Sequence, residues 1–187
     1  MQYSSIAWQT TAWLNTPEPL TLESLRGKVV LLHAFQMLCP GCVAHGIPQA
    51  QRVASLFAGA PLVVIGLHTV FEHHEAMQLE SLRAFLHEYR VKFPVGVDAP
   101  SATGDAIPQT MKAYAMQGTP TTVLIDAQGR RRRQLFGLHE DLLLGAELAT
   151  LLSEVSATTL AAQVRVVTAS PDCDSNSCTV PEIAANG

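Results

Sequence analysis

Two cysteines three positions apart, Cys39 and Cys42, constrain the fold of this chain more than any other feature of its sequence. An apolar run at residues 29–32 precedes them, and a helix-compatible segment, residues 43–57, follows. This order of strand, Cys-x-x-Cys and helix suits thiol–disulfide exchange, because backbone N–H groups and the dipole at a helix N-terminus favour a thiolate on the first cysteine. Pro40 suits the first helical position, where its missing N–H is not needed. Cys42, one turn further on, is spaced to attack a mixed disulfide on Cys39 and release the product.

The composition is that of a globular protein. Of the 187 residues, 48% are apolar and 15% are charged, which is enough apolar material for a proper core. The net charge of −4 gives no electrostatic case for binding nucleic acid or an anionic membrane. One basic run, Arg130-Arg131-Arg132-Arg133, follows turn-forming residues, and we interpret it as the solvated flank of a hairpin.

Targeting signals and cysteine usage bear on the compartment. We find no apolar run long enough to span a bilayer, and residues 1–5 show neither the basic region nor the following apolar stretch of a signal peptide. We therefore expect a cytoplasmic location, or a periplasmic one if a leader has been removed. The four cysteines form two close pairs in a chain with ample core, which indicates redox or metal chemistry rather than a disulfide scaffold.

Strand and helix patterns alternate along the chain. The residues 28–36 read as a strand buried on both faces, and Pro48 should kink the helix that follows Cys42. Trp8 and Trp13 should pack an N-terminal strand or hairpin against the body. The pattern predicts an α/β fold with a central mixed β-sheet flanked by helices on both faces. Further strands are predicted at residues 61–69, 93–98, 118–126 and 132–137, with a possible one at 163–168, and further helices at 79–89, 107–116 and 141–155.

Three features of the sequence carry a resemblance to a known family. The first is the strand, Cys39-Pro40-Gly41-Cys42 and helix with a downstream proline; the second is the Gly118-Thr119-Pro120-Thr121-Thr122 strand with its hairpin; the third is the inserted helix and strand ending near Phe93. From about residue 20 to 152 the chain resembles the thioredoxin superfamily, and within it the TlpA/ResA-like (redoxin) thiol–disulfide oxidoreductases. On this basis we divide it into an N-terminal strand or hairpin extension (1–19), a thioredoxin-like domain (20–155) and a C-terminal extension (156–187).

The resemblance implies roles for the residues around the cysteines. Thr119-Pro120 should be a cis peptide that places the backbone of Thr119 next to Cys39, where it can pair with the extended chain of a substrate. Pro40 and Gly41 complete the expected substrate-binding set. The sequence also departs from the family. Leu38 stands where many members have Trp, and Pro48 falls one residue later than the usual kink proline.

Two acidic positions that handle protons in such proteins are histidines here. His33 stands six residues before Cys39, and His45 stands three residues after Cys42. Because Cys42 should be the more buried thiol, it needs a base when it resolves the mixed disulfide, and a neutral imidazole can act as that base. The alternative is that His33 is a satisfied strand histidine and His45 an exposed helix residue. Glu72, in a polar loop, is a weaker third candidate.

Other functions for the same residues stay open. Cys39 and Cys42 with His68, His73 or His74 would satisfy a tetrahedral metal site on paper, although no second close Cys/His pair lies near them. A thiol-dependent peroxidase is the competing enzyme class. The Pro-x-x-x-Thr-x-x-Cys pattern that holds a peroxide is missing, however, because Leu32 and Gln36 occupy its Pro and Thr positions. A non-catalytic thioredoxin-fold binding module is a third alternative, and the intact cysteines argue against it.

A second pair of cysteines, Cys173 and Cys178, lies in a C-terminal segment of turn-forming residues. They are either an internal relay that exchanges with Cys39 and Cys42, or a static pair without a role. We expect an enzyme that exchanges dithiol and disulfide with protein substrates and a redox partner. No organic cofactor is implied, because no Gly-rich phosphate loop follows a strand, and we assign no metal.

Overall fold

The computed structural model describes residues 6–167 of the chain, with side chains described as far as residue 157. Among these residues, 6–155 belong to one compact unit, and a second unit begins at residue 156. The first unit holds a six-stranded sheet in the order β1-β4-β3-β2-β5-β6. Its strands are β1 (Thr10–Leu14), β2 (Val29–Phe35), β3 (Leu62–His68), β4 (Val95–Asp98), β5 (Thr121–Ile125) and β6 (Arg131–Phe136).

The sheet is mixed, as predicted. β2, β3 and β4 run parallel, whereas β1, β5 and β6 each pair antiparallel with a neighbour. The central strand β2 is buried along its whole length, because both faces of the sheet are covered. The predicted N-terminal strand is β1, and it pairs with β4 at one edge of the sheet. Trp8 is buried in the core and Trp13 packs against the same apolar cluster.

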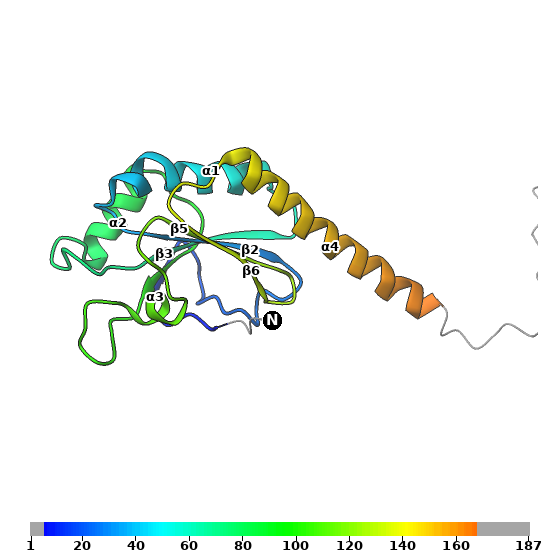
Figure 1. Cartoon of the computed structure of the whole chain (residues 1–187), viewed down its shortest axis with the longest axis horizontal. Coiled ribbons are helices and arrows are strands. Elements are labelled where there is room, and N and C mark those ends of the chain that lie inside the picture. The colour runs from blue at the N-terminus through cyan, green and yellow to red at the C-terminus, as the bar shows by residue number, and fades with distance from the viewer. Residues whose placement is uncertain (1–5, 168–187) are drawn as a thin grey trace, which may run out of the picture. The chain divides into compact units, whose positions relative to one another are not determined.

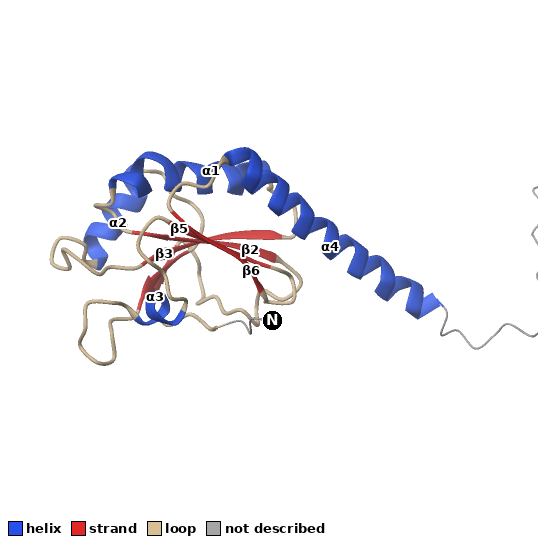
Figure 2. Ribbon diagram, in the orientation of Figure 1, coloured by secondary structure: helices blue, strands red, loops and turns tan. Residues whose placement is uncertain are grey.

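The helices lie on both faces of the sheet (Figure 1). One face is covered by α1 (Ile47–Leu56), α2 (Leu79–Glu88) and the first turns of α4 (Asp141–Val167), whose apolar residues share one core cluster. The other face is covered by α3 (Gln109–Ala113) and by loops from the N-terminal region. Figure 2 shows the strands as a single layer between α1 and α3. The predicted α/β fold with helices on both faces is therefore confirmed.

The helix after the cysteines is irregular at its start. Residues Cys42–Gly46 form a π-helical turn, η1, in which the backbone N–H of Ile47 donates to the carbonyl of Cys42. Pro48 explains this turn, since a proline inside a helix lacks the N–H and its ring clashes with the carbonyl four residues earlier. The wider turn moves that carbonyl away. The kink predicted at Pro48 stays a prediction, and the irregularity that the structure shows beside it is this π turn.

The arginine run is ion-paired rather than simply solvated. Arg130 and Arg132 both contact the buried carboxylate of Asp126, at 2.8 and 3.3 Å. Arg132 also forms a two-pronged contact with Glu154 of α4, at 2.6 and 3.0 Å. These contacts attach the β5–β6 hairpin to the last helix of the first unit. Our interpretation of the run as a hairpin flank missed this role, because the acidic partners lie far away in the sequence.

The prediction of a strand at residues 163–168 is wrong. Helix α4 continues to Val167, and residue 168 lies outside the described part of the chain. The β-branched residues Val164, Val166 and Val167 suggested a strand by local propensity. The helix had already begun at Asp141, and extending an existing helix costs far less than nucleating a new element.

Candidate active site

The two cysteines of the Cys-x-x-Cys motif meet at the end of β2. Cys39 is half-buried, Cys42 is fully buried, and both are free thiols. The Cys42 thiol donates to Cys39 Sγ at 2.7 Å, and the backbone N–H of Cys42 donates to the same sulfur at 3.3 Å. The helix begins at Pro40, so this N–H is one of the free donors of its first turn. Cys39 Sγ therefore accepts from a backbone N–H as well as from the Cys42 thiol.

Cys42 is the thiol that resists ionisation. Burial raises the pKa of Cys42 to about 12, and the nearby Cys39 thiol adds to the rise. The predicted order of burial, with Cys42 deeper than Cys39, is confirmed. A thiol with such a pKa is protonated at neutral pH. It therefore needs a proton acceptor before it can attack another sulfur.

The Thr119–Pro120 peptide faces the cysteines. It is cis, as the resemblance implied. The Cys39 thiol lies 3.4 Å from the carbonyl oxygen of Thr119, to which it donates. Gly41 lies on the other side of the proline, where an added Cβ would be 3.4 Å from Pro120 Cδ. The structure thus brings together the cysteines and the predicted substrate-binding residues Thr119, Pro120 and Gly41, with Pro40 exposed beside them.

His33 lies beneath this site. It is buried in β2 opposite Thr122 of β5, and burial lowers its pKa to about 4. The ring occupies a slot beside the π turn: a Cβ added to Gly46 would lie 2.7 Å from His33 Nε2 and 3.3 Å from Pro120 Cβ. Any residue other than glycine at position 46 would place its Cβ in the space that the His33 ring occupies. His33 Nε2 has no hydrogen-bond partner among the described residues.

The other proposed proton carriers are more exposed. His45 lies on the π turn and is open to solvent. With His33 it lines a cavity of about 170 Å³ between η1, Pro120 and residues 137–139. Glu72 accepts a long hydrogen bond, 3.4 Å, from the side chain of Gln36. Of the three candidates, His33 and His45 therefore line one cavity, whereas Glu72 lies in the loop after β3 and does not line it.

Sequence reasoning missed several buried polar residues around the site. Gln36 is buried, and its side chain also accepts from the backbone N–H of Phe71, so it ties the turn before Cys39 to the loop after β3. Gln49 of α1 donates to the carbonyl of His139 and to the Asp141 carboxylate. His139 is buried, with Nε2 3.2 Å from Glu147. Only the position of Gln36, three residues before Cys39, offered a signal.

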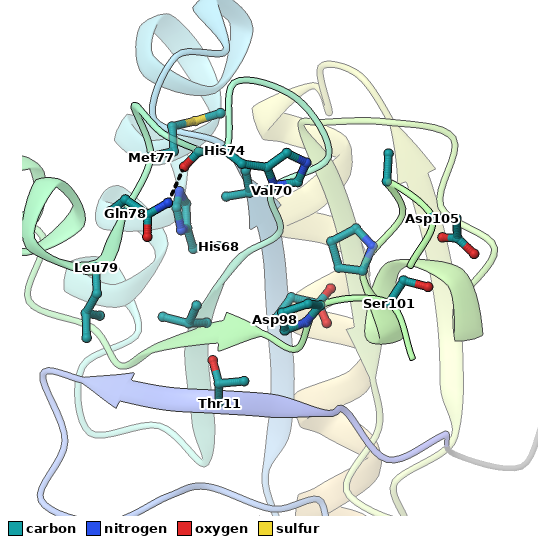
Figure 3. A pocket seen from close by; sticks show the side chains of 14 residues that line it. Thr11, His68, Val70, His74, Met77, Gln78, Leu79, Asp98, Ser101 and Asp105 are labelled. Carbon is teal, nitrogen blue, oxygen red and sulfur yellow. Dashed lines mark hydrogen bonds between the residues drawn. The ribbon is translucent and has the colours of Figure 1, made fainter. Parts of the chain in front are cut away.

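A second cavity, of about 300 Å³, lies at the carboxyl ends of β3 and β4. Figure 3 shows His68 and Gln78 on one side of it, and Asp98, Ser101 and Asp105 on the other. His68 is buried, its Nε2 lacks a partner in the described part of the chain, and burial lowers its pKa to about 4. Asp98 is held by three hydrogen bonds from Thr69, Thr110 and Met111.

Two absences within the described part of the chain bear on other functions. Among them, no three His, Cys, Asp or Glu side chains are grouped so as to hold a metal ion, and His68, His73 and His74 are not joined with the cysteines. No described helix combines the length and the apolar character needed to cross a bilayer. Cys173 and Cys178 lie outside the described residues.

The fold and the comparisons together define the class. A Cys-x-x-Cys pair at a helix N-terminus, facing a cis-proline on a mixed sheet, is the arrangement of a thioredoxin-like thiol–disulfide oxidoreductase. The Redoxin family model matches residues 8–133, and the chain belongs to this family, within the TlpA/ResA-like part of the thioredoxin superfamily.

Solved structures and a curated relative agree with this assignment. A crystal structure of a thioredoxin-like superfamily protein is 57% identical, with a TM-score of 0.78, over 80% of this chain and 96% of that one. A thiol-disulfide isomerase from Corynebacterium glutamicum is 48% identical with a TM-score of 0.77, again over 80% and 96%. Protein DipZ of Mycobacterium tuberculosis is 32% identical over 129 residues, which cover 68% of this chain but 17% of DipZ. The chain thus spans about a sixth of that relative.

Proposed function

We propose that this chain exchanges dithiol and disulfide with protein substrates through Cys39 and Cys42. In the reducing direction the Cys39 thiolate attacks one sulfur of a substrate disulfide, and the other substrate sulfur leaves as a thiolate that takes up a proton. The Cys42 thiolate then attacks the Cys39 sulfur. A Cys39–Cys42 disulfide forms, and the second substrate sulfur leaves and is protonated. Two electrons and two protons pass from the chain to the substrate, and the reverse sequence oxidises a dithiol.

One observation carries the proposal. Cys39 Sγ receives the backbone N–H of Cys42 at 3.3 Å and lies 2.7 Å from the Cys42 sulfur, beside the Thr119 carbonyl. The attacking sulfur, the resolving sulfur and a backbone edge that can pair with a substrate chain therefore share one point. The thiol-disulfide isomerase of Corynebacterium glutamicum, which is similar over 80% of this chain, supports the same chemistry.

The proton of Cys42 goes to a histidine in this proposal. His33 is neutral at physiological pH because burial lowers its pKa to about 4, so its lone pair is free, but the same burial makes it a weak base toward the Cys42 thiol, whose pKa burial raises to about 12. His45 lines the same cavity and reaches solvent. We assign the acceptance of the proton to His33 and its passage to solvent to His45. Thr119, Pro120, Pro40 and Gly41 shape the surface that receives the substrate.

The tail cysteines add a second step to the proposal. Cys173 and Cys178 exchange with the Cys39–Cys42 disulfide and pass its oxidation state to a redox partner. The spacing of four residues between the two cysteines lets them close a small disulfide loop, and a tether within the same chain raises their effective concentration. The expected cytoplasmic location belongs to this proposal as well.

The test is a redox titration of the full chain against glutathione, with trapping of intermediates. Cys42→Ser should accumulate a mixed disulfide with substrate on Cys39, whereas Cys39→Ser should lose exchange by at least about 10³-fold, because the attacking thiolate is gone. Cys173→Ser with Cys178→Ser is the variant for the relay. This double variant should retain the redox couple of Cys39 and Cys42 and lose a second redox couple, that of Cys173 and Cys178. A chain that exchanges equally well without Cys39 would contradict the proposal.

A further inference from the structure

The cavity beside the active site is shaped for one side chain. Its volume of about 170 Å³ is several times the ~30 Å³ share of a water molecule and well below the ~300 Å³ at which whole small-molecule pockets begin. Its walls come from η1 and the start of α1, from the strand after Pro120, and from residues 137–139. None of the described residues that line it is an Asp, Glu, Lys or Arg. A charged group placed there would therefore lose its hydration without gaining a counter-ion.

Polar atoms without a hydrogen-bond partner belong to two histidines that line this cavity, His33 and His139. His33 Nε2 and His139 Nδ1 are both buried without a partner in the described part of the chain, and His33 is the one packed beside Pro120 and Gly46. Buried polar atoms in native proteins nearly always have a partner, supplied by protein, water or ligand. The Nε2 side of the ring packs against Gly46, which also lines the cavity. A polar group that enters the cavity can therefore supply the missing partner.

The cavity adjoins the reaction centre through two shared neighbours. Pro120 and Gly41 line it, and both also border the cysteines: Gly41 lies between them in the sequence, and Pro120 follows the Thr119 carbonyl that Cys39 contacts. Leu138 forms part of the rim and is 56% exposed. A substrate chain held against Thr119 with its sulfur at Cys39 would therefore lie close to two residues of the cavity wall, Gly41 and Pro120.

We propose that this cavity is a specificity subsite that takes one uncharged side chain near the substrate cysteine, with an apolar body and a hydroxyl tip that hydrogen-bonds His33 Nε2. Tyrosine has this chemistry. The inference rests on the proposed thiol–disulfide exchange and adds a preference among substrates. Leu138 and Pro120 contact the apolar body, and His33 selects the polar tip.

The experiment uses the full chain and a series of disulfide-linked peptides that differ at one position near the cysteine. That position carries Tyr, Phe, Ala or Asp, and is moved along both sides of the cysteine. At one register we expect kcat/KM for Tyr to exceed that for Ala by about tenfold, with Phe between them and Asp lowest. Hydroxyethyl disulfide, which has no side chain to insert, measures exchange independently of the subsite.

Two exposed leucines supply the matched variants. Leu138→Glu places a carboxylate at the rim and should cut the Tyr advantage to less than about twofold, with hydroxyethyl disulfide reduced as before. Leu142→Glu makes the same change at a residue that is 91% exposed and does not line the cavity, and it should keep the preference. Equal rates for Tyr, Ala and Asp at every register, with hydroxyethyl disulfide still reduced, would overturn the subsite alone. Equal rates for Tyr and Phe would overturn the hydrogen bond to His33. Failure to reduce hydroxyethyl disulfide would overturn the proposed function itself.

Discussion

Two buried histidines on neighbouring strands, His33 of β2 and His68 of β3, differ in what surrounds them rather than in how they are buried. In each, burial lowers the pKa to about 4 and Nε2 lacks a partner among the described residues. Both rings contact Phe35, His33 stacked at 6.2 Å and His68 tilted at 5.3 Å between centroids. His33, however, touches the glycine of the π turn and the cavity beside Pro120, whereas His68 lines the cavity at the ends of β3 and β4.

A histidine with a shifted pKa is often taken to be a catalytic residue. The comparison of His33 with His68 separates the shifted pKa from the catalytic role. Burial by itself fixes the protonation state and costs stability in acid. Proximity to the reacting sulfur decides whether that state is used in catalysis. The two histidines should therefore behave alike in unfolding experiments and differently in activity assays.

The largest expected effect tests whether burial acts in the same way on His33 and His68. Between about pH 6.5 and 4 the unfolded chain protonates these histidines while the folded chain does not, so the unfolded state binds more protons and stability falls as the pH falls. Each histidine should contribute a loss of about 3 kcal/mol over this window. His33→Gln and His68→Gln should each flatten the pH dependence by that amount in urea unfolding. An unchanged slope in either variant would show that its histidine titrates normally.

The next effect tests the slot that only His33 has. In Gly46→Ala the new Cβ would lie 2.7 Å from His33 Nε2, closer than real Cβ contacts allow, so the ring must move. We expect a loss of about 2 kcal/mol in the free energy of unfolding, together with slower closure of the Cys39–Cys42 disulfide. Gly145→Ala is the control, because nothing lies within 4 Å of its added Cβ in helix α4, and it should stabilise the chain by about 0.5–1 kcal/mol. Equal losses in both variants would contradict a specific slot.

The smallest effect tests whether His33, unlike His68, takes part in the resolving step. His33→Gln should slow the resolving step by about tenfold, which is less than the roughly 10²–10⁴-fold usual for general base catalysis, because His45 lines the same cavity and because burial makes His33 a weak base. His68→Gln should change that rate by less than about twofold. Stopped-flow measurement of mixed-disulfide decay over a range of pH provides the comparison. If both variants slowed the step equally, the effect would come from lost packing around Phe35, and His33 would have no role as a base.

Local sequence signals predicted the central features of the fold and the site. The buried run of β2, the Cys-x-x-Cys pair and the Thr-Pro-Thr-Thr strand each depend on neighbouring residues, and their positions and the cis peptide are as expected. The burial of Cys42 followed from its place one turn into a core-facing helix. The roles assigned to His33, His45 and the substrate-binding residues stay predictions, because geometry alone does not measure them.

Features that depend on contacts distant in the sequence were missed. The Arg132–Glu154 contact joins residues 22 positions apart, and no local pattern marks the two as partners. The cavity around His68 forms from β1, β3, β4 and two loops, so it exists only once the sheet has assembled. The π turn was predictable only in part. Pro48 indicated that the helix would be irregular, but the local sequence does not say that the backbone adopts a π turn.

The arginines of β6 have a consequence for how separate copies of the chain meet in solution. β6 is an outer strand of the sheet, so its free backbone edge is a template onto which a strand of another molecule could add. Three consecutive arginines, Arg131, Arg132 and Arg133, lie on this strand, and Arg132 and Arg133 are held in ion pairs with Asp126, Glu154 and Glu147. A second copy docking there would have to take these ion-paired side chains out of water, which costs free energy. The residues that attach the hairpin to α4 thus also disfavour edge-to-edge pairing of β6 between copies of the chain.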